Sequence, residues 1–210
     1  MATRVILVDD HLIVSQGLKS VLQAEQFDVV GEAANGYEAV KLAQKVLPDV
    51  AVLDLSMPML NGIDAAREIV KVSPETKTML LTMHTEDHYI LEALRAGIRG
   101  YILKSHAVTD LIQGIREVFR GGIYLSPGIS RAVVDAYLSR TELPPEVLTP
   151  RERQVLQLIA EGKSTKEVAV LLGVSTKTAE SHRTRIMSKL DIHETATLVR
   201  YAIRLGLVQA

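Results

Sequence analysis

Five polar or charged side chains stand where apolar runs of the sequence end. They are Asp9, Asp10, Asp54, Thr82 and Lys104. Asp54 raises the question most sharply, because it ends the run Val50-Ala51-Val52-Leu53, which is suited to burial. An ionised carboxylate buried without a partner is unfavourable, so another group must hold it or use it.

These groups suit phosphoryl chemistry if one edge of a sheet brings them together. Three carboxylates in one crevice repel each other unless a cation neutralises them. An all-oxygen set favours Mg²⁺, so Asp9, Asp10 and Asp54 are candidate ligands. Lys104 then faces a phosphoryl group as a point charge, and Thr82 donates a hydrogen bond to it. Asp54 becomes the natural nucleophile, able to form an acyl phosphate.

The first 120 residues have the pattern that would position these groups. Apolar runs at 5–8, 27–30, 50–53, 78–81 and 101–103 alternate with amphipathic stretches near 12–22, 36–47, 62–72, 86–96 and 107–120. This alternation predicts an α/β fold with a five-stranded, parallel, doubly wound sheet of the flavodoxin-like type. A single acid at a strand end is usually a turn former or a helix cap. The coincidence over four of the five strand ends therefore carries the prediction.

The pattern changes after residue 121, where we place the end of the first domain. Ser126 and Pro127 predict the start of a helix near 127–140. The stretch "TELPPEV" has two consecutive prolines and no periodicity, so residues 122–147 are interpreted as a linker that includes this helix. Residues 148–210 then form a second, all-helical domain.

The second domain has the features of a helix-turn-helix unit. Capping boxes begin at Thr149 and Ser164, and Gly162 and Gly173 stand where helices should stop. Residues 148–210 contain 10 Lys+Arg and 6 Asp+Glu (net +4), whereas residues 1–147 contain 14 and 19 (net −5). A small basic unit on an acidic one suggests nucleic acid as a partner, although a solvated basic face is the ordinary alternative.

The helix that begins after Ser175 is the candidate for the major groove. On a helical projection its apolar face contains Ala179 and Ile186, and His182 is expected to pack toward that side. The candidate DNA-contacting residues are Lys177, Glu180, Ser181, Thr184, Arg185 and Lys189. Among them, the three cations are the candidates for phosphate contacts.

The motifs "ILVDDH", "VLDLSMPMLNG", "LLTMH" and "GYILKS", in this order and spacing, resemble the receiver domain of two-component response regulators over about residues 3–120. The resemblance implies that Asp54 accepts a phosphoryl group from a sensor histidine kinase. It also implies that the backbone carbonyl of Ser56 joins the Mg²⁺ ligands. Thr82 and Tyr101 match the family's switch pair, and Lys104 matches its lysine.

Two positions near this site stay open. Many receivers follow the lysine with a proline, usually in cis, whereas this chain has Ser105, and a cis bond before a non-proline residue is costly. His84 stands two residues beyond Thr82. It either flanks the phosphoryl group and affects hydrolysis, or it is an exposed loop histidine.

The stretch "LTPRERQVLQLIAEGKSTKEVAVLLGVSTKTAESHRTRIMSKL" resembles the LuxR-type DNA-binding domain of the NarL/FixJ family. The resemblance implies that Glu180, Ser181 and Thr184 face bases, in agreement with the helical projection. It also implies a final helix, Thr195 to Leu205, that can mediate dimerisation. The expected partners are therefore a sensor histidine kinase, double-stranded DNA and a second copy of the chain.

The leading hypothesis is a transcription regulator switched by phosphorylation, with no enzymatic activity beyond Mg²⁺-dependent self-phosphorylation and slow autodephosphorylation. One alternative is a phosphatase of the haloacid dehalogenase type, which would need a second Asp where this chain has Ser56. Another is a constitutive DNA-binding protein with a structural receiver. The absence of cysteine and of a membrane-length apolar run leads us to expect a cytoplasmic protein with no membrane partner.

Overall fold

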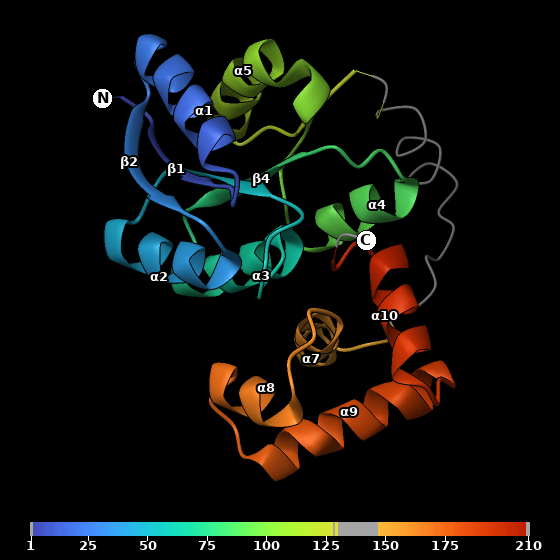
Figure 1. Ribbon diagram of the computed structural model, residues 1–210. Helices are drawn as coiled ribbons and strands as arrows, with labels where there is room; N and C mark the ends of the chain where they lie inside the picture. The colour runs from blue at the N-terminus through green and yellow to red at the C-terminus, as the bar shows by residue number, and fades with distance from the viewer. Residues whose placement is uncertain (1, 128, 130–146, 209–210) are drawn as a thin grey trace. The chain divides into compact units, whose positions relative to one another are not determined.

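Aliphatic runs in the first part of the chain form buried parallel strands, and the stretches between them form helices, as the computed structural model shows (Figure 1). In chain order the elements are β1 Arg4–Val8, α1 Leu12–Ala24, β2 Asp28–Ala33, α2 Gly36–Val46, β3 Val50–Asp54, α3 Gly62–Val72, β4 Lys77–Thr82, α4 Asp87–Arg95, β5 Gly100–Leu103, the 3₁₀ turn η1 Lys104–His106 and α5 Ala107–Phe119. With β6 Tyr124–Leu125 added, the strand order is β2-β1-β3-β4-β5-β6, and all pairs are parallel, which confirms the predicted fold class.

The sheet has a sixth strand that the sequence analysis did not predict. β6, Tyr124–Leu125, pairs in parallel with β5, so that Tyr124 lies opposite Gly100 and Leu125 opposite Tyr101. A strand of two residues is too short to contain an aliphatic run from which it could be predicted. Both residues fall within the predicted linker range 122–147. The sheet therefore continues past the boundary predicted at residue 121.

Ser126 anchors this added strand. Its backbone N–H donates to the carbonyl of Tyr101 (2.9 Å), and its hydroxyl accepts from the backbone N–H of Leu103 (3.2 Å) and donates to Asp110 Oδ2 (2.6 Å). The serine expected to cap a helix thus binds β5 and α5. The helix expected near 127–140 lies outside the described residues, which are 2–127, 129 and 147–208.

Two apolar layers cover the sheet because side chains alternate along each strand. Val5 and Leu7 of β1 pack with residues of α1 and α5, including Leu22 and Ile115. Ile6 and Val8 instead face the layer formed with α2, α3 and α4. Figure 1 shows α1 and α5 together on one side of the sheet and α2 and α3 on the other. The core of this unit is therefore mostly aliphatic on both faces.

The chain divides into two compact units, Met1–Thr141 and Glu142–Ala210. The second contains α7 Pro150–Ala160, α8 Thr165–Leu171, α9 Thr176–Leu190 and α10 Thr195–Arg204. α7 contacts α8, α9 and α10, and α8 contacts α9. Among the residues that the structure describes, no helix has the length and apolar character needed to cross a membrane.

Side-chain caps begin α7, α8 and α9 where the sequence predicted them. The capping boxes at Thr149 and Ser164 both form, and Ser175 caps α9 by accepting a hydrogen bond from the backbone N–H of Thr178. Gly162 and Gly173 have φ values of 81° and 64°, which places them in the left-handed region favoured at helix ends.

Candidate phosphoacceptor and DNA-binding sites

The carboxyl ends of β1 and β3 bring the predicted acids together. These strands are neighbours in register, with Val8 beside Leu53, so the residues after β1 lie next to Asp54. One ligand atom from each of Asp9, Asp10, His11 and Asp54 lies within 4.8 Å of the others. The side chains of Asp9 and Asp54 are each only 5% exposed, whereas that of Asp10 is 32% exposed. The result is an acidic pocket that is buried at its base and open on one side.

At the base of this pocket, Lys104 contacts both Asp9 and Asp54. Its Nζ lies 2.8 Å from Asp9 Oδ2 and 2.9 Å from Asp54 Oδ2. Burial raises the pKa of Asp54, and the ammonium of Lys104 offsets only part of that effect. Burial disfavours the charged form of Lys104, but Asp54 and Asp9 outweigh it and raise the pKa of the ammonium. The lysine is therefore a firmly held cation beside the candidate phosphoacceptor.

Oxygen donors of this kind fit a hard divalent cation. Asp9 and Asp54 engage Lys104 through their Oδ2 atoms, and Asp10 is partly open to solvent. Mg²⁺ keeps several waters and takes only one or two carboxylates together with phosphate oxygens. The donor set and the open side of the acidic pocket are thus compatible with Mg²⁺. Ser56 lies two residues beyond Asp54, in the bend that follows β3.

Thr82 and Tyr101 are both buried, each 1% exposed. The hydroxyl of Thr82 accepts a hydrogen bond from the backbone N–H of His84 (3.1 Å), and the Tyr101 hydroxyl donates to the His84 carbonyl (3.1 Å). Burial raises the pKa of Tyr101, which keeps the phenol neutral. The two residues that match the switch pair thus both bind the backbone of His84, Thr82 at its N–H and Tyr101 at its carbonyl.

His84 is not an exposed loop histidine, since its side chain is only 28% exposed. Its Nε2 lies 3.1 Å from Ser56 Oγ, and its ring packs on Tyr89 with centroids 4.7 Å apart. The histidine therefore spans from β4 to the bend after Asp54. No peptide bond among the described residues is cis, so the bond between Lys104 and Ser105 is trans. The question that the sequence left open about this bond is thereby answered.

The DNA-contacting residues predicted on α9 all lie on its exposed surface. Lys177, Glu180, Ser181, Thr184, Arg185 and Lys189 are all exposed. Ala179 and Ile186 are buried on the opposite side, as the helical projection predicted. His182 lies between the two faces, and its Nδ1 is buried. α9 therefore presents a polar face while its apolar face packs on α7 and α8.

Lys189 has a contact that the sequence analysis missed. Its Nζ lies 2.6 Å from Oε2 of Glu152, the same oxygen that completes the capping box with Thr149. The Glu152 side chain is 5% exposed and the Lys189 side chain 40%. The lysine assigned to a DNA phosphate thus also joins the end of α9 to the start of α7. Only the fold reveals this pairing, because 37 residues separate the two partners.

The Glu152 carboxylate gives the second unit a dependence on pH. Burial favours the neutral acid, but hydrogen bonds from Lys189 and Thr149 outweigh it and lower the pKa of Glu152 below its ordinary value of 4.5. Its contribution to stability is therefore complete above the unfolded pKa and is lost as the pH falls through the folded pKa. We expect Glu152→Gln to destabilise this unit by about 1–2 kcal/mol at pH 7 and by less near pH 3.

Hydrogen exchange of α7 and α9 amides in the full chain would measure that difference. Glu167→Gln is the matched control, because Glu167 completes the same kind of capping box on α8 while exposed, and among the described contacts no lysine forms a hydrogen bond with its carboxylate. The Glu167 variant should change protection less than the Glu152 variant. Equal effects of the two variants at pH 7 would contradict the assignment of a special role to the Glu152–Lys189 pair.

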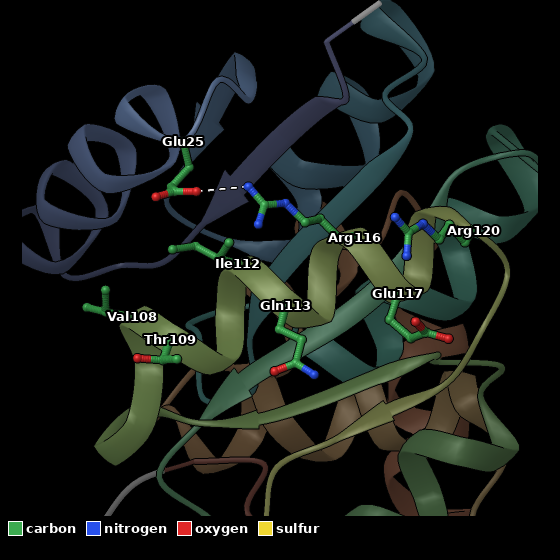
Figure 2. A pocket seen from close by; sticks show the side chains of 8 residues that line it. All are labelled: Glu25, Val108, Thr109, Ile112, Gln113, Arg116, Glu117 and Arg120. Atoms are coloured by element: carbon green, nitrogen blue, oxygen red, sulfur yellow. Dashed lines mark hydrogen bonds and ion pairs between the residues drawn. The ribbon is translucent and has the colours of Figure 1, made fainter.

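A hollow of about 550 Å³ lies away from the acidic pocket, between the end of α1 and one side of α5 (Figure 2). Arg116 of α5 binds Glu25 Oε2 at 2.8 Å, and its guanidinium lies 5.7 Å from the centroid of the Phe27 ring. Arg120 and Glu117 also line the hollow. Two arginines balance two glutamates here, so the hollow has no excess charge that would select an ion.

The buried acidic edge of a parallel sheet and the separate helix-turn-helix unit together define a class, the response regulators that control transcription. A family model for the response regulator receiver domain matches residues 5–116, and one for bacterial regulatory proteins of the luxR family matches residues 146–202. The chain belongs to the NarL/FixJ family of response regulators, in which these two domains occur together.

Several known proteins are similar to this chain over nearly its whole length. The transcriptional regulatory protein MctR of Rhizobium johnstonii is 38% identical over 206 residues, covering 98% of this chain and 95% of MctR. The oxygen regulatory protein NreC of Staphylococcus carnosus is 37% identical over 210 residues, covering 96% and 97%. A solved structure of RcsB from Salmonella typhimurium has a TM-score of 0.66 and 30% identity, covering 96% and 97%. Another RcsB structure is a complex with DNA, with a TM-score of 0.60 and 30% identity over 96% of this chain and 98% of RcsB.

Proposed function

We propose that this transcription regulator accepts a phosphoryl group on Asp54 from a sensor histidine kinase, in a Mg²⁺-dependent reaction. Phosphorylation then controls its dimerisation and its sequence-specific binding to double-stranded DNA. The observation that carries the proposal is the convergence of Asp9, Asp10 and Asp54 with Lys104 at one sheet edge. The same chain has a helix, α9, with an exposed polar face. Binding of chromosomal DNA through that face would place the protein in the cytoplasm.

Asp54 is the group that reacts. One of its carboxylate oxygens forms the new O–P bond as the P–N bond of the kinase's phosphohistidine breaks, and the imidazole leaves. Asp9, Asp10, Asp54 and the backbone carbonyl of Ser56 would hold Mg²⁺, which when bound neutralises charge on the transferring phosphoryl oxygens. Positioning by the rigid strand β3 limits the motion of the nucleophile.

Lys104 and Thr82 would bind the oxygens of the phosphoryl group once it is on Asp54. The Lys104 ammonium already lies 2.9 Å from Asp54 Oδ2, so a small movement brings it to a phosphoryl oxygen. The Thr82 hydroxyl accepts from His84 N–H and has its own proton to donate to the phosphoryl group. Movement of Thr82 would shift the backbone of His84, whose carbonyl accepts the hydrogen bond from the Tyr101 hydroxyl. This coupling is how the proposed switch pair would report phosphorylation to the surface around α4 and β5.

The exposed face of α9 supplies the DNA contacts in this proposal. Glu180, Ser181 and Thr184 would face base edges, while Lys177, Arg185 and Lys189 would contact phosphates. Solved structures of RcsB bound to DNA as dimers support this use of the domain and a homodimer on DNA.

Ser56 offers a hydroxyl rather than a second carboxylic acid, which argues against efficient phosphatase turnover.

Arg185→Ala is expected to weaken DNA binding roughly equally on specific and unrelated duplexes. A lost phosphate contact lowers affinity without relaxing specificity, and it should reduce the slope of log affinity against log salt by about one. Fluorescence anisotropy over a salt series would measure both quantities. Arg204→Ala is the control, because Arg204 is also exposed but lies on α10 beside Tyr201. An unchanged salt slope in the Arg185 variant would remove this residue from the interface.

The whole proposal is tested by selecting bound genomic fragments with and without beryllofluoride, a phosphoryl mimic, in the presence of Mg²⁺. We expect beryllofluoride to change the affinity for a reproducible set of fragments in the wild type and to change nothing in Asp54→Asn. Equal affinities with and without the mimic in the wild type would instead favour a constitutive DNA-binding protein with a structural receiver.

A further inference from the structure

The acidic pocket also contains an imidazole nitrogen, that of His11, which could ligate a metal ion and has no role in the proposed function. His11 Nδ1 lies 2.9 Å from Asp10 Oδ1 and 3.3 Å from Asp9 Oδ1. It is also among the four ligand atoms that lie within 4.8 Å of one another, with Asp54 as the fourth residue. His11 is the N-cap residue of α1, but its side chain makes no capping hydrogen bond. The ring is therefore turned toward the carboxylates and not toward the helix.

The backbone of His11 is fixed in this position by one of the acids. Its N–H donates to Asp9 Oδ1 at 2.8 Å, while Asp9 Oδ2 binds Lys104 at 2.8 Å. Within the pocket, Oδ2 of Asp9 therefore faces the Lys104 ammonium, and Oδ1 faces His11. The His11 side chain is 57% exposed, which leaves the ring room to adjust and leaves the pocket open for water or a phosphoryl group.

The separations suit a single ion. Zn²⁺ is most often tetrahedral, and bonds of about 2.1 Å then place its ligand atoms about 3.4 Å apart. The two distances from His11 Nδ1 to the carboxylate oxygens are close to that value. The four ligand atoms lie within 4.8 Å of one another, so they must draw together by up to about 1.4 Å when the ion binds.

Adding an imidazole changes which ion the pocket prefers. Mg²⁺ takes oxygen ligands, whereas imidazole suits Zn²⁺ and other divalent transition ions. We propose that His11 Nδ1 ligates the ion held by Asp9, Asp10 and Asp54, so that this pocket binds Zn²⁺ far more tightly than Mg²⁺. The inference rests on the metal-binding pocket of the proposed function. It adds that Zn²⁺ and other divalent transition ions compete with Mg²⁺ for that pocket.

Calorimetric titration of the full chain with Mg²⁺ and with Zn²⁺ tests the preference. His11→Ala is expected to lower the affinity for Zn²⁺ by about tenfold or more, since even groups that only orient a ligand contribute that much. The affinity for Mg²⁺ should change little. His11→Asn keeps a side chain suited to an N-cap and replaces nitrogen with oxygen, so it should lose the Zn²⁺ preference while remaining folded.

His193→Ala is the matched control. His193 is 84% exposed, and its Nε2 lies 3.4 Å from Asp191 Oδ1, so it is a histidine beside one carboxylate outside the pocket. Removing it should leave the affinities of the acidic pocket unchanged. Pulsed EPR of the protein loaded with Cu²⁺, another ion that imidazole suits, provides a second readout, because a directly bound imidazole gives a ¹⁴N coupling that should vanish in His11→Ala.

Unchanged Zn²⁺ affinity in His11→Ala, or a wild-type Cu²⁺ signal without ¹⁴N coupling, would overturn the inference. If Mg²⁺ still binds and acetyl phosphate still labels Asp54 in that case, the proposed function stands without it. If the wild type binds neither ion, the metal part of the proposed function fails together with the inference.

Discussion

Protein carrying Asp54→Asn is expected to take up no phosphoryl group from acetyl phosphate, whereas the wild type is labelled. The amide occupies nearly the same volume but lacks the nucleophilic carboxylate, so the pocket remains while the acceptor is gone. Lys104 keeps its contact with Asp9 at 2.8 Å, which preserves a partner for the ammonium. Intact-protein mass spectrometry after incubation with Mg²⁺ and acetyl phosphate measures the outcome.

Glu75→Gln is the control for loss of one negative charge, because the Glu75 side chain is fully exposed and lies outside the pocket. It should be labelled like the wild type. Labelling of Asp54→Asn at the wild-type level would assign the acceptor to another residue, with Asp9 and Asp10 the nearest carboxylates. Peptide mapping of the labelled protein would then locate it.

Gly62→Ala is expected to destabilise the first unit by about 3 kcal/mol, a large effect for one methyl group. Gly62 begins α3, and a Cβ there would lie far inside van der Waals contact with the backbone carbonyl oxygen of Asp54, with Leu80 also close. The obstacle is backbone, not the end of a flexible side chain, so relaxation must move either the helix or the end of β3. The Gly62 N–H also donates to the carbonyl of Leu55 at 2.9 Å, which keeps α3 close.

Denaturant unfolding, followed by circular dichroism, measures this destabilisation. Gly17→Ala is the matched control: Gly17 lies inside α1, and no neighbouring side chain or strand comes within 4 Å of the place that a methyl group would take. Alanine there should therefore stabilise by about 0.5–1 kcal/mol. Because relaxation around Gly62 displaces Asp54, the folded fraction of Gly62→Ala should also accept phosphate more slowly. Unchanged stability and labelling would show that the two backbones do not need to approach so closely.

The hydrophobic pattern was enough to predict the doubly wound fold, because buried parallel strands such as β3 are apolar on both faces and leave a clear run in the sequence. Capping boxes at Thr149 and Ser164 were equally local, since each bond spans three residues. β6 was missed for the opposite reason. Its two residues join the sheet through pairing with β5 and through the contacts of Ser126, which connect residues far apart in the chain.

The acidic pocket shows the same division. Strand ends predicted that Asp9, Asp10, Asp54 and Lys104 would meet, because parallel strands bring their carboxyl ends to one edge. That His84 would turn toward Ser56 depends on how the loop after β4 packs. His11 stood in the motif beside Asp10, but its position alone does not say whether the ring faces the carboxylates or solvent.

By itself the sequence determined the fold class, the strand ends that carry the acids and the exposed polar face of α9, since each depends on periodicity or short spacing. Only the tertiary structure decided which polar atoms meet across elements. It joined Lys189 to Glu152, Tyr101 to the His84 backbone and Gly62 to the carbonyl of Asp54. Such contacts depend on packing to within an ångström between segments distant in the chain, and no local pattern of residues encodes that distance.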